Sequence, residues 1–398
     1  MTMQTRLPGR VVIVGASQAG LAAAETLRKE GFNGGLTIVG SETHLPYQRP
    51  PLSKHVLAGA WSHERTFLRH EHELEALGAS WRLGVSAVAL DRANRRVELS
   101  DGSNVEFDGL VIATGASPRR MGVGHELHGV HVLRTLDDAA AIGAELTAGR
   151  RLTIIGAGFL GCEVAAVARK AGMHVDIIDP LPGPMIRQLG QDVAARMAAV
   201  HLSNGTKMHL GAGVADFKKR LGHVTGVELT DGSTLDSDLV LVAVGAVPNT
   251  QWLAGNGLSL TKGIDCDEFC RAAPGIVAAG DVASWIHPIY RRRVRIEHQT
   301  NAIEQGVAAA RALLDKAVEP FAPIPYFWTD QYDVKVQVYG IPHAEAATTI
   351  VRGDPEDGRF AVAYHHDRRK VAILTWNLPR EAVKLRGELV DELQASTS

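Results

Sequence analysis

The sequence predicts an α/β protein with two Rossmann-like dinucleotide-binding domains and a small α+β domain at the C-terminal end. An internal repeat supports this prediction: residues 11–28 (VVIVGASQAGLAAAETLR) resemble residues 152–169 (LTIIGAGFLGCEVAAVAR). Each copy passes from an apolar β-type run through a glycine-rich turn into an alanine-rich helical stretch. A second apolar run follows, LTIVG in the first copy and VDIID in the second. This order of strand, turn, helix and strand forms the unit that holds a dinucleotide.

The overall composition excludes several other classes of protein. The chain of 398 residues is long enough for two or three domains with cores of their own. A formal net charge of -2 gives no general attraction to nucleic acid or to an anionic membrane. The three cysteines do not suggest a disulfide framework, and no apolar run is long enough to cross a membrane. The stretch 11–24 contains a glycine-rich turn, so we interpret it as part of the first repeat and not as a signal sequence. We therefore expect a cytoplasmic protein.

The first glycine-rich turn has the pattern Gly15-x-Ser17-x-x-Gly20. Gly15 permits a tight turn, and Gly20 lets the helix pack closely on the strand, so the start of the helix faces a pyrophosphate. Ser17 replaces the middle glycine, and its side chain must be tolerated by the pyrophosphate or donate a hydrogen bond to it.

An acidic residue is expected at the end of the second strand, where it accepts a hydrogen bond from a ribose hydroxyl. Ser41 and Glu42 occupy this region. Glu42 is the better candidate, although an exposed loop glutamate without a ligand remains an alternative. The stiff proline-rich loop that follows carries Arg49 and Lys54. These charges suit a place beside phosphate and flavin, and equally a solvated loop.

The second glycine-rich turn, Gly156-x-Gly158-x-x-Gly161, is complete, with Phe159 and Leu160 between its last two glycines. Asp179 ends the next apolar run, 21 residues after Gly158 (179 − 158). A carboxylate there favours a free 2′-hydroxyl, so this unit is expected to bind NADH and not NADPH. The nearby Arg187 leaves a 2′-phosphate as an alternative.

Glu163 lies just inside the helix that follows the second turn. A carboxylate near a helix start is favourable because of the helix dipole alone. Alternatively, Glu163 pairs with Lys54 where nicotinamide meets flavin, and composition does not choose between the two.

The pair Gly280-Asp281 ends a late apolar strand and could bind the sugar chain of a flavin. Together with the first unit, it implies an FAD-binding domain made of two parts, with the NADH-binding domain inserted between them. Prolines at 320, 323 and 325 mark a further boundary. The expected segments are 1–113 (FAD, first part), 114–244 (NADH), 245–320 (FAD, second part) and 321–398 (C-terminal α+β domain).

The motifs RPPLSK, ATG, LRTLDDA, GAGFLGCE, VAVGAVPN, AAGDVA and FWTDQYD occur in this order along the chain. In this order they resemble the FAD-dependent ferredoxin reductases that serve bacterial cytochrome P450 and Rieske-type oxygenases. These enzymes have a glutathione-reductase-type fold with two dinucleotide-binding domains. The resemblance covers essentially the whole chain, and RPPLSK and FWTDQYD are its most specific parts.

The resemblance implies a role for individual residues. Lys54 and Glu163 would line the nicotinamide pocket, Asp179 would bind the adenosine ribose, and Trp328 would lie near the flavin on the side where the iron–sulfur partner docks. Gln299 would lie near the flavin ring. The other expected cofactor contacts are Ala19, Ser41, Ala87, Ala113, Thr114, Gly115, Arg134, Gly245, Asp281 and His298.

Three positions depart from the family pattern. Ser41 replaces the usual acid, Gly183 stands where a basic residue is common, and Gln299 stands where many relatives have a bulkier residue. These departures leave open which residue meets the FAD ribose, how firmly the NADH adenosine is held and how the flavin is packed.

The expected activity is hydride transfer from NADH to FAD, followed by single-electron transfer to a [2Fe-2S] ferredoxin that supplies a P450 or Rieske-type oxygenase. Lys54, Glu163 and Trp328 are the expected catalytic residues. Such ferredoxins are usually acidic, so a basic docking patch is expected. One candidate is formed by Arg291, Arg292, Arg293 and Arg295, and the other by Lys384 and Arg386.

Three alternatives remain. A disulfide reductase is disfavoured because no cysteine precedes residue 162. An NADH-dependent reductase of a quinone or of monodehydroascorbate has the same two-nucleotide core. A non-catalytic flavoprotein related to apoptosis-inducing factor would carry longer extensions. No metal site is expected, because the paired histidines at 70 and 72 would not share a helix face.

Overall fold

The computed structural model describes residues 8–343 and 345–395. By internal packing the chain divides into two compact units. The first holds the described chain up to Gln48 together with Thr66–Ser117 and Pro248–Pro325. The second holds Arg49–Arg65, Pro118–Val247 and the described chain from Tyr326 onwards. The division into four domains made from the sequence stays a prediction.

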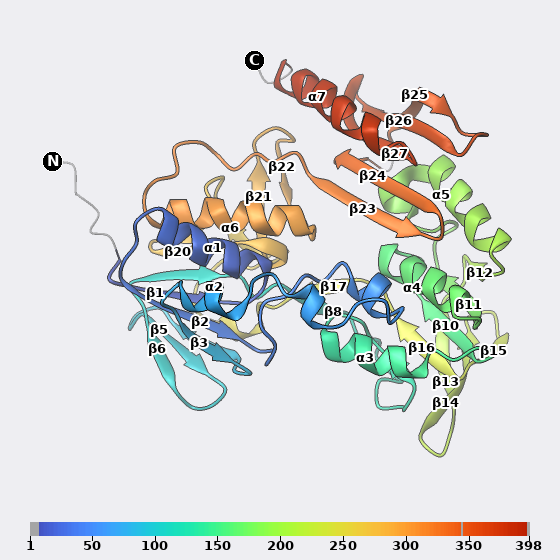
Figure 1. The fold of residues 1–398 in the computed structure, drawn as a ribbon, viewed down its shortest axis with the longest axis horizontal. Helices are drawn as coiled ribbons and strands as arrows, with labels where there is room; N and C mark the ends of the chain where they lie inside the picture. The colour runs from blue at the N-terminus through green and yellow to red at the C-terminus, as the bar shows by residue number, and fades with distance from the viewer. Residues whose placement is uncertain (1–7, 344, 396–398) are drawn as a thin grey trace. The chain divides into compact units, whose positions relative to one another are not determined.

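The first unit is built on a six-stranded sheet with the spatial order β19-β20-β7-β1-β2-β3 (Figure 1). All its neighbouring strands are parallel except the β19–β20 pair. The strands are β1 (Arg10–Val14), β2 (Gly35–Gly40), β3 (Ser80–Leu83), β7 (Gly109–Ile112), β19 (Arg271–Ala273) and β20 (Ile276–Ala278). The late strand β20 lies beside β7, so sequence from the end of this unit completes the sheet that the first repeat begins.

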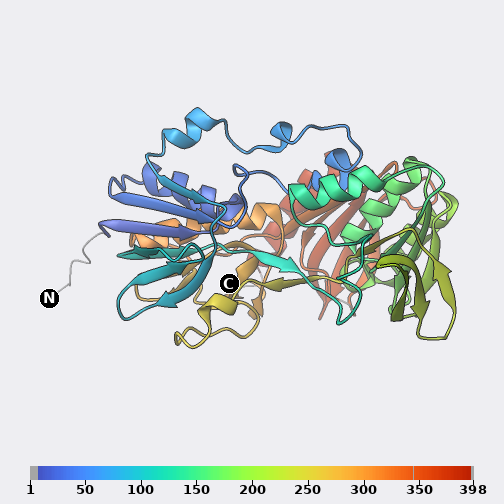
Figure 2. The same cartoon turned by 90° about the horizontal axis from the view of Figure 1, so that it is seen from below.

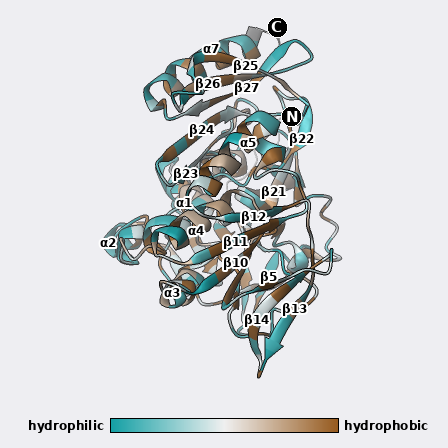
Figure 3. Ribbon diagram, turned by 90° about the vertical axis from the view of Figure 1, so that its right-hand side faces the viewer, coloured by the Kyte–Doolittle hydropathy of each residue, from teal (hydrophilic) through white to brown (hydrophobic). Residues whose placement is uncertain are grey.

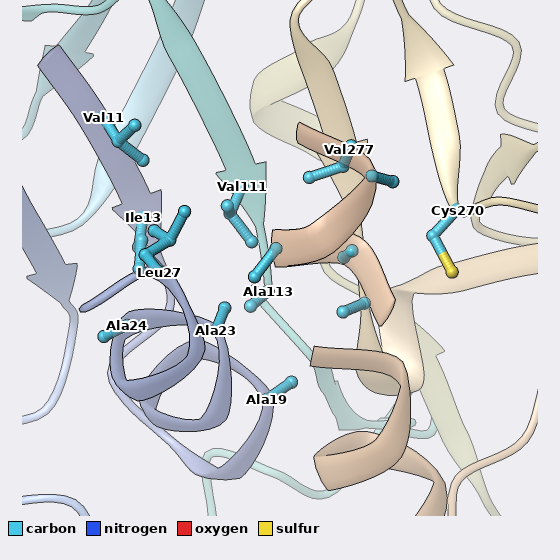
Figure 4. Close-up of a cluster of buried hydrophobic side chains, with 14 of the residues drawn as sticks. Val11, Ile13, Ala19, Ala23, Ala24, Leu27, Val111, Ala113, Cys270 and Val277 are labelled. Atoms are coloured by element: carbon cyan, nitrogen blue, oxygen red, sulfur yellow. The ribbon is translucent and has the colours of Figure 1, made fainter. Parts of the chain in front are cut away.

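Both faces of this sheet are buried, as is usual for parallel strands. Val11 and Ile13 of β1 face helices α1 (Gln18–Lys29) and α6 (Gln299–Leu313), and Figure 4 shows this cluster. The alternate residues Val12 and Val14 belong to a second core on the other face.

Smaller elements complete the first unit. The second core joins the main sheet to two three-stranded sheets, β4-β5-β6 and β18-β21-β22. The elements are α2 (Glu71–Glu75), β4 (Ala87–Asp91), β5 (Arg96–Leu99), β6 (Asn104–Glu106), β18 (Ile264–Cys266), β21 (Ala283–His287), β22 (Arg292–Val294), and the 3₁₀ turns at Gln251–Leu253 and Gly280–Val282.

The second unit repeats this plan with a five-stranded parallel sheet, β12-β11-β10-β16-β9. Figure 3 shows β10 and β11 as largely hydrophobic strands. The parallel strands and their helices are β9 (Val130–His131), β10 (Arg151–Ile155), β11 (His174–Asp179), β12 (Lys207–Leu210), β16 (Leu239–Val242), α3 (Leu136–Glu145), α4 (Phe159–Lys170) and α5 (Ile186–Ser203). An antiparallel sheet of β13 (Val214–Arg220), β14 (His223–Leu229) and β15 (Thr234–Asp236) packs beside it.

A third sheet of the same unit is also antiparallel, has the order β23-β24-β27-β26-β25 and carries the C-terminal helix α7 (Pro379–Ala395). Its strands are β23 (Tyr326–Gln331), β24 (Val334–Gly340), β25 (Ala347–Asp354), β26 (Arg359–His366) and β27 (Arg369–Trp376). Buried Tyr364 donates a hydrogen bond from its hydroxyl to the carbonyl of Leu189 in α5 (2.7 Å).

The proline-rich segment from Arg49 to Arg65 also folds with the second unit. It forms a π-helical turn, Leu52–Val56, that packs against α3 and α4. Figure 2 shows this blue segment against the green helices of that unit. The chain crosses between the units within the short strands β8 (Ala116–Pro118) and β17 (Ala246–Pro248).

The first unit contains a buried histidine at the end of β21. His287 is fully buried; its Nε2 donates to the carbonyl of Pro323 (2.8 Å) and its Nδ1 accepts from the amide of Ile289 (3.3 Å). Burial lowers the pKa of His287 from 6.5 to about 4. The neutral ring thus connects the last segment of this unit, at Pro323, to β21.

Stability should fall as His287 takes up a proton. Because the folded pKa lies below the unfolded value, its stabilising contribution is complete above pH 6.5 and is lost as the pH falls towards 4. We expect this histidine to account for a loss of about 2 kcal/mol in the free energy of unfolding between pH 7 and pH 5. Urea denaturation at both pH values checks this, with His287→Gln as the comparison. A variant whose stability falls as steeply as that of the wild type would contradict the assignment.

Candidate functional site

The two glycine-rich turns have the geometry that the repeat predicts. Gly15 and Gly156 have φ angles of +123° and +111°. A Cβ added at Gly15 would lie 2.0 Å from the carbonyl oxygen of Ala113, and one at Gly156 would lie 2.4 Å from that of Ala243. Only glycine fits such a left-handed turn against a neighbouring strand.

The last glycine of each turn lets the helix approach the turn. A Cβ on Gly20 would lie 1.8 Å from the carbonyl oxygen of Gly15, and one on Gly161 would lie 2.1 Å from that of Gly156. Helices α1 and α4 therefore begin directly at the ends of β1 and β10, with their first amide groups beside the turn.

The middle positions of the turns differ. Gly158 is the N-cap of α4, and a Cβ there would meet nothing within 4 Å, so the turn leaves open space. Ser17 is the N-cap of α1, and its hydroxyl makes no capping hydrogen bond. The buried side-chain nitrogen of the next residue, Gln18, has no partner within the described part of the chain. The open space and the unused donors fit a pyrophosphate at each turn.

Asp179 holds the second turn in place. Its Oδ2 accepts from the amide of Ala157 inside that turn (2.7 Å), and its Oδ1 accepts from the amide of Leu181 (2.8 Å). A carboxylate oxygen can accept more than one hydrogen bond, so the side chain can also serve a ribose hydroxyl. The backbone role was not predicted from the sequence.

The corresponding end of β2 carries both predicted candidates. Ser41 is exposed, whereas Glu42 is partly buried and accepts a hydrogen bond from the hydroxyl of buried Tyr47. This contact orients the Glu42 carboxylate, and it is a partner that sequence reasoning missed.

The remaining predicted FAD contacts of the first unit lie in several segments. Ala19 is buried where α1 packs against α6. The two helices are in close contact there, since a Cβ on Gly306 of α6 would lie 2.4 Å from the carbonyl oxygen of Ala19. Thr114 exchanges two hydrogen bonds with Asn249, which the prediction missed: its hydroxyl donates to the Asn249 carbonyl (2.9 Å), and the Asn249 amide donates to its carbonyl (2.8 Å). The other predicted positions in this unit are Ala87 on β4, Ala113 and Gly115 after β7, Gly280 and Asp281 after β20, and His298 and Gln299 at the start of α6.

Gly280 and Asp281 follow β20 in a 3₁₀ turn. The amide of Gly280 donates to the buried side-chain oxygen of Gln305 on α6 (2.9 Å). Burial lowers the pKa of His298 to about 4, against an opposing effect of the Asp281 charge, so this ring is neutral at pH 7.

Arg49, Lys54, Arg134 and Gly245 belong to the second unit. The Arg49 guanidinium donates to the carbonyl of Arg134 (2.6 Å), and the carbonyl of Gly245 accepts from the amide of Arg119 (2.8 Å). Contacts of these residues with a cofactor are therefore proposals.

Lys54 and Glu163 form an ion pair, which was one of the two roles that the sequence allowed for Glu163. The ammonium of Lys54 lies 2.7 Å from Oε2 of Glu163, and the side chains are only 13% and 7% exposed. Ser53 donates to the same oxygen (2.5 Å), and Thr329 donates to Oε1 (2.7 Å). Neither Ser53 nor Thr329 was predicted, although both lie inside the quoted motifs RPPLSK and FWTDQYD.

Strand β23 presents different residues on its two faces. Phe327 packs edge-on against Phe159 of α4, with ring centroids 5.1 Å apart. On the alternate positions, Trp328 stacks on Tyr326 (5.7 Å), and Tyr326 stacks on Tyr339 (4.6 Å). The guanidinium of Arg386 lies 6.0 Å from the centroid of the Tyr339 ring. Trp328 is thus the end of an aromatic row with a cation at its other end.

The three cysteines are free and buried. Burial raises the pKa of the Cys266 thiol to about 12, and it also raises the pKa of the Cys162 and Cys270 thiols well above its ordinary value. Thiol–disulfide chemistry needs a thiolate, which these environments disfavour.

An open cleft of about 1110 Å³ lies between α4, α5 and the C-terminal sheet of the second unit. It contains none of the predicted site residues. Its cation Arg196 pairs with Glu356 (3.1 Å), and Lys170 donates to the carbonyl of Tyr332 (3.2 Å). Within residues 8–343 and 345–395 no group of three or more histidine, cysteine or acidic side chains is arranged to hold a metal. Over the same residues, no helix combines the length and apolar character needed to cross a membrane.

Two family models match the chain. Residues 9–306 match the pyridine nucleotide-disulphide oxidoreductase family, and residues 326–396 match the reductase C-terminal family. Together they cover both repeats and the C-terminal sheet.

Individual relatives match over nearly their whole length. Rhodocoxin reductase from Rhodococcus erythropolis is 36% identical, over 96% of this chain and 90% of the relative. The ferredoxin–NAD(+) reductase component of the anthranilate 1,2-dioxygenase system of Burkholderia cepacia is 37% identical, over 93% and 91%. The solved covalent complex of putidaredoxin reductase with putidaredoxin matches with a TM-score of 0.93 and 34% identity, over 97% of this chain and 94% of that chain.

Proposed function

Because the chain belongs to the pyridine nucleotide-disulphide oxidoreductase family and, within it, to the ferredoxin reductases that include rhodocoxin reductase, we propose that it is an NADH-dependent ferredoxin reductase. The fold class and the family predicted from the sequence are confirmed. The activity would pass a hydride from NADH to FAD and then single electrons to a [2Fe-2S] ferredoxin that supplies a P450 or Rieske-type oxygenase.

The buried Lys54–Glu163 pair is the observation that carries this proposal. Glu163 lies in the second turn of α4, after the glycine-rich turn that suits NADH, and Lys54 lies on the π-helical turn that packs against this helix. An ammonium that is held by a buried carboxylate offers a fixed positive charge where reduced flavin would be negative. The thiols are buried and protonated, so a disulfide acceptor is disfavoured.

We assign the nucleotide-binding roles residue by residue. The other predicted positions keep the roles expected from the sequence, but Glu42 is preferred over exposed Ser41 for the FAD ribose because Tyr47 orients its carboxylate. The FAD set is Gly15, Ser17, Ala19, Gly20, Glu42, Arg49, Lys54, Ala87, Ala113, Thr114, Gly115, Arg134, Gly280, Asp281, His298 and Gln299. The NADH set is Gly156, Gly158, Phe159, Leu160, Gly161, Glu163, Asp179 and Gly245.

We place the ferredoxin at the aromatic row that ends in Trp328. Arg386 lies at the other end of that row, whereas Lys384, two residues earlier on α7, is exposed on a different side of the helix. In the alternative patch, Arg293 and Arg295 already pair with Asp265 and Glu297. We therefore prefer Arg386 as the contact for an acidic partner, because it adjoins the aromatic row that ends in Trp328.

We propose that the enzyme works in the cytoplasm, where NADH is available. Its cysteines are free thiols, as expected for a protein of a reducing compartment.

The activity is tested by anaerobic oxidation of NADH with a panel of acceptors: [2Fe-2S] ferredoxins, quinones, disulfides and, in air, oxygen. The proposal expects a ferredoxin to be the fastest acceptor at equal concentration. Faster turnover with a quinone than with every ferredoxin would overturn it.

Asp179→Asn should raise the KM for NADH about tenfold and narrow the preference over NADPH by a similar factor, because the charge that favours a free 2′-hydroxyl is lost. Asparagine keeps an acceptor oxygen for only one of the two backbone amides that Asp179 holds, so it also weakens the turn. Steady-state kinetics with both nucleotides measure this. Asp176→Asn, on the same strand but paired with His209, is the control and should change neither constant. An unchanged nucleotide preference in the Asp179 variant would remove the assignment.

Trp328→Ala should slow ferredoxin reduction about tenfold while leaving reduction of ferricyanide, which needs no docking face, within about twofold. Trp61→Ala is the matched control, because Trp61 stacks on His55 in the same unit, away from the aromatic row. Equal losses with both acceptors would place Trp328 outside the docking face.

Arg386→Glu should raise the KM for an acidic ferredoxin severalfold and weaken its dependence on ionic strength, since exposed charges act mainly on encounter. Arg292→Glu, in the alternative patch, should have little effect. The reverse result would move the docking site to the β22 region.

A further inference from the structure

A chain of buried polar side chains leads to Glu163 from the opposite side to Lys54. Thr329 donates to Oε1 of Glu163 (2.7 Å), and its own oxygen accepts from the side-chain nitrogen of Gln331 (3.0 Å). The oxygen of Gln331 contacts Nε2 of His201 (2.8 Å). All of these side chains are buried, and the exposed fraction of Thr329 and His201 is 0%.

The direction of every hydrogen bond in this chain is determined. The nitrogen of Gln331 is directed to Thr329, so its oxygen faces His201, which therefore donates from Nε2. Burial lowers the pKa of His201, so the ring is neutral and Nδ1 carries no proton. In agreement, Nδ1 of His201 has no hydrogen-bond partner among the described residues. All donors therefore point towards Glu163.

The two carboxylate oxygens of Glu163 thus have separate tasks. Among the described residues, Oε2 receives Lys54 and Ser53 from the proline-rich segment, whereas Oε1 receives Thr329. A carboxylate held at one oxygen alone can rotate about its last torsion, which is broad for glutamate. Fixing Oε1 therefore fixes the direction in which Oε2 meets the ammonium.

We propose that Thr329, held by Gln331 and His201, is a positioning residue for hydride transfer: it orients the carboxylate of Glu163 and thereby the ammonium of Lys54. This inference rests on the proposed function. It assigns a role to the buried face of β23, whose other face carries Trp328.

The chain offers a matched control. Thr375 on β27 is 1% exposed, and its hydroxyl oxygen is buried without a hydrogen-bond partner in the described part of the chain. Thr329→Val and Thr375→Val make the same chemical change in the same sheet. Only the first leaves a buried carboxylate oxygen without its donor. Thr329→Ser retains the hydroxyl.

The first measurement is thermal unfolding, which does not depend on activity. The midpoint of Thr329→Val should fall below that of Thr375→Val by several degrees, because removing one partner of a charged hydrogen bond costs more than removing an unpaired hydroxyl. Equal midpoints would overturn the inference.

The second measurement is anaerobic stopped-flow reduction of the FAD-loaded enzyme. At saturating NADH, the limiting rate of Thr329→Val should fall about tenfold, while Thr329→Ser and Thr375→Val stay within about twofold of the wild type. Reduction by dithionite should be equal in all four proteins, which shows that the flavin remains bound and reducible.

The outcomes separate the two proposals. If NADH does not reduce the wild type, the proposed function fails and this inference fails with it. If NADH reduces the wild type and Thr329→Val is as fast as Thr375→Val, the inference alone is overturned. A slow Thr329→Val with a restored rate in Thr329→Ser supports it.

Discussion

The carboxylate of Glu163 is the group on which the second unit depends most. It is almost fully buried, and a buried charge is stable only if it is paired and hydrogen-bonded. Glu163 lies on α4, and its partners come from two other parts of the sequence, the proline-rich segment and β23. Removing any one of these partners would leave the buried charge incompletely satisfied, so the three segments must come together for the unit to be stable.

Strand β23 shows how one short segment serves two purposes. Its residues alternate between faces, as in every β-strand. Phe327, Thr329 and Gln331 contact residues of α4 and α5, while Tyr326 and Trp328 belong to the aromatic row. Alternate residues of the motif FWTDQYD therefore attach β23 to the rest of the unit or contribute to the aromatic row. A substitution at one position can leave the adjacent function untouched.

Much of the fold was predictable from sequence because it is decided locally. Gly15, Gly20, Gly156 and Gly161 stand where a backbone atom leaves no room for a side chain, and such positions are visible in the spacing of the glycines. The strand–turn–helix–strand repeats, the late strand that completes the first sheet and the C-terminal α+β region also followed from pattern and composition. The Lys54–Glu163 pair was one of two readings that the sequence allowed.

The parts that were missed depend on distant partners. Thr329 and Glu163 are 166 residues apart, and His201 and Gln331 are 130 apart. A threonine in a β-rich run is ordinary, so nothing local distinguishes Thr329 from Thr375, which has no partner in the described residues. The hydrogen bonds of Asp179 to backbone amides were missed for another reason. Binding of a ribose hydroxyl already explained an acid at the end of this strand, so no second role was considered.

The division of the chain has a consequence for how the protein is made. The sequence crosses between the two units after residues 48, 65, 117, 247 and 325. Neither unit can therefore fold completely until late in synthesis. The first sheet is incomplete until β20 has been synthesised, and Glu163 lacks one of its donors until Thr329 has been synthesised. During synthesis the nascent chain carries two incomplete cores at once. Efficient production thus depends on keeping both from aggregating until the last quarter of the polypeptide has emerged.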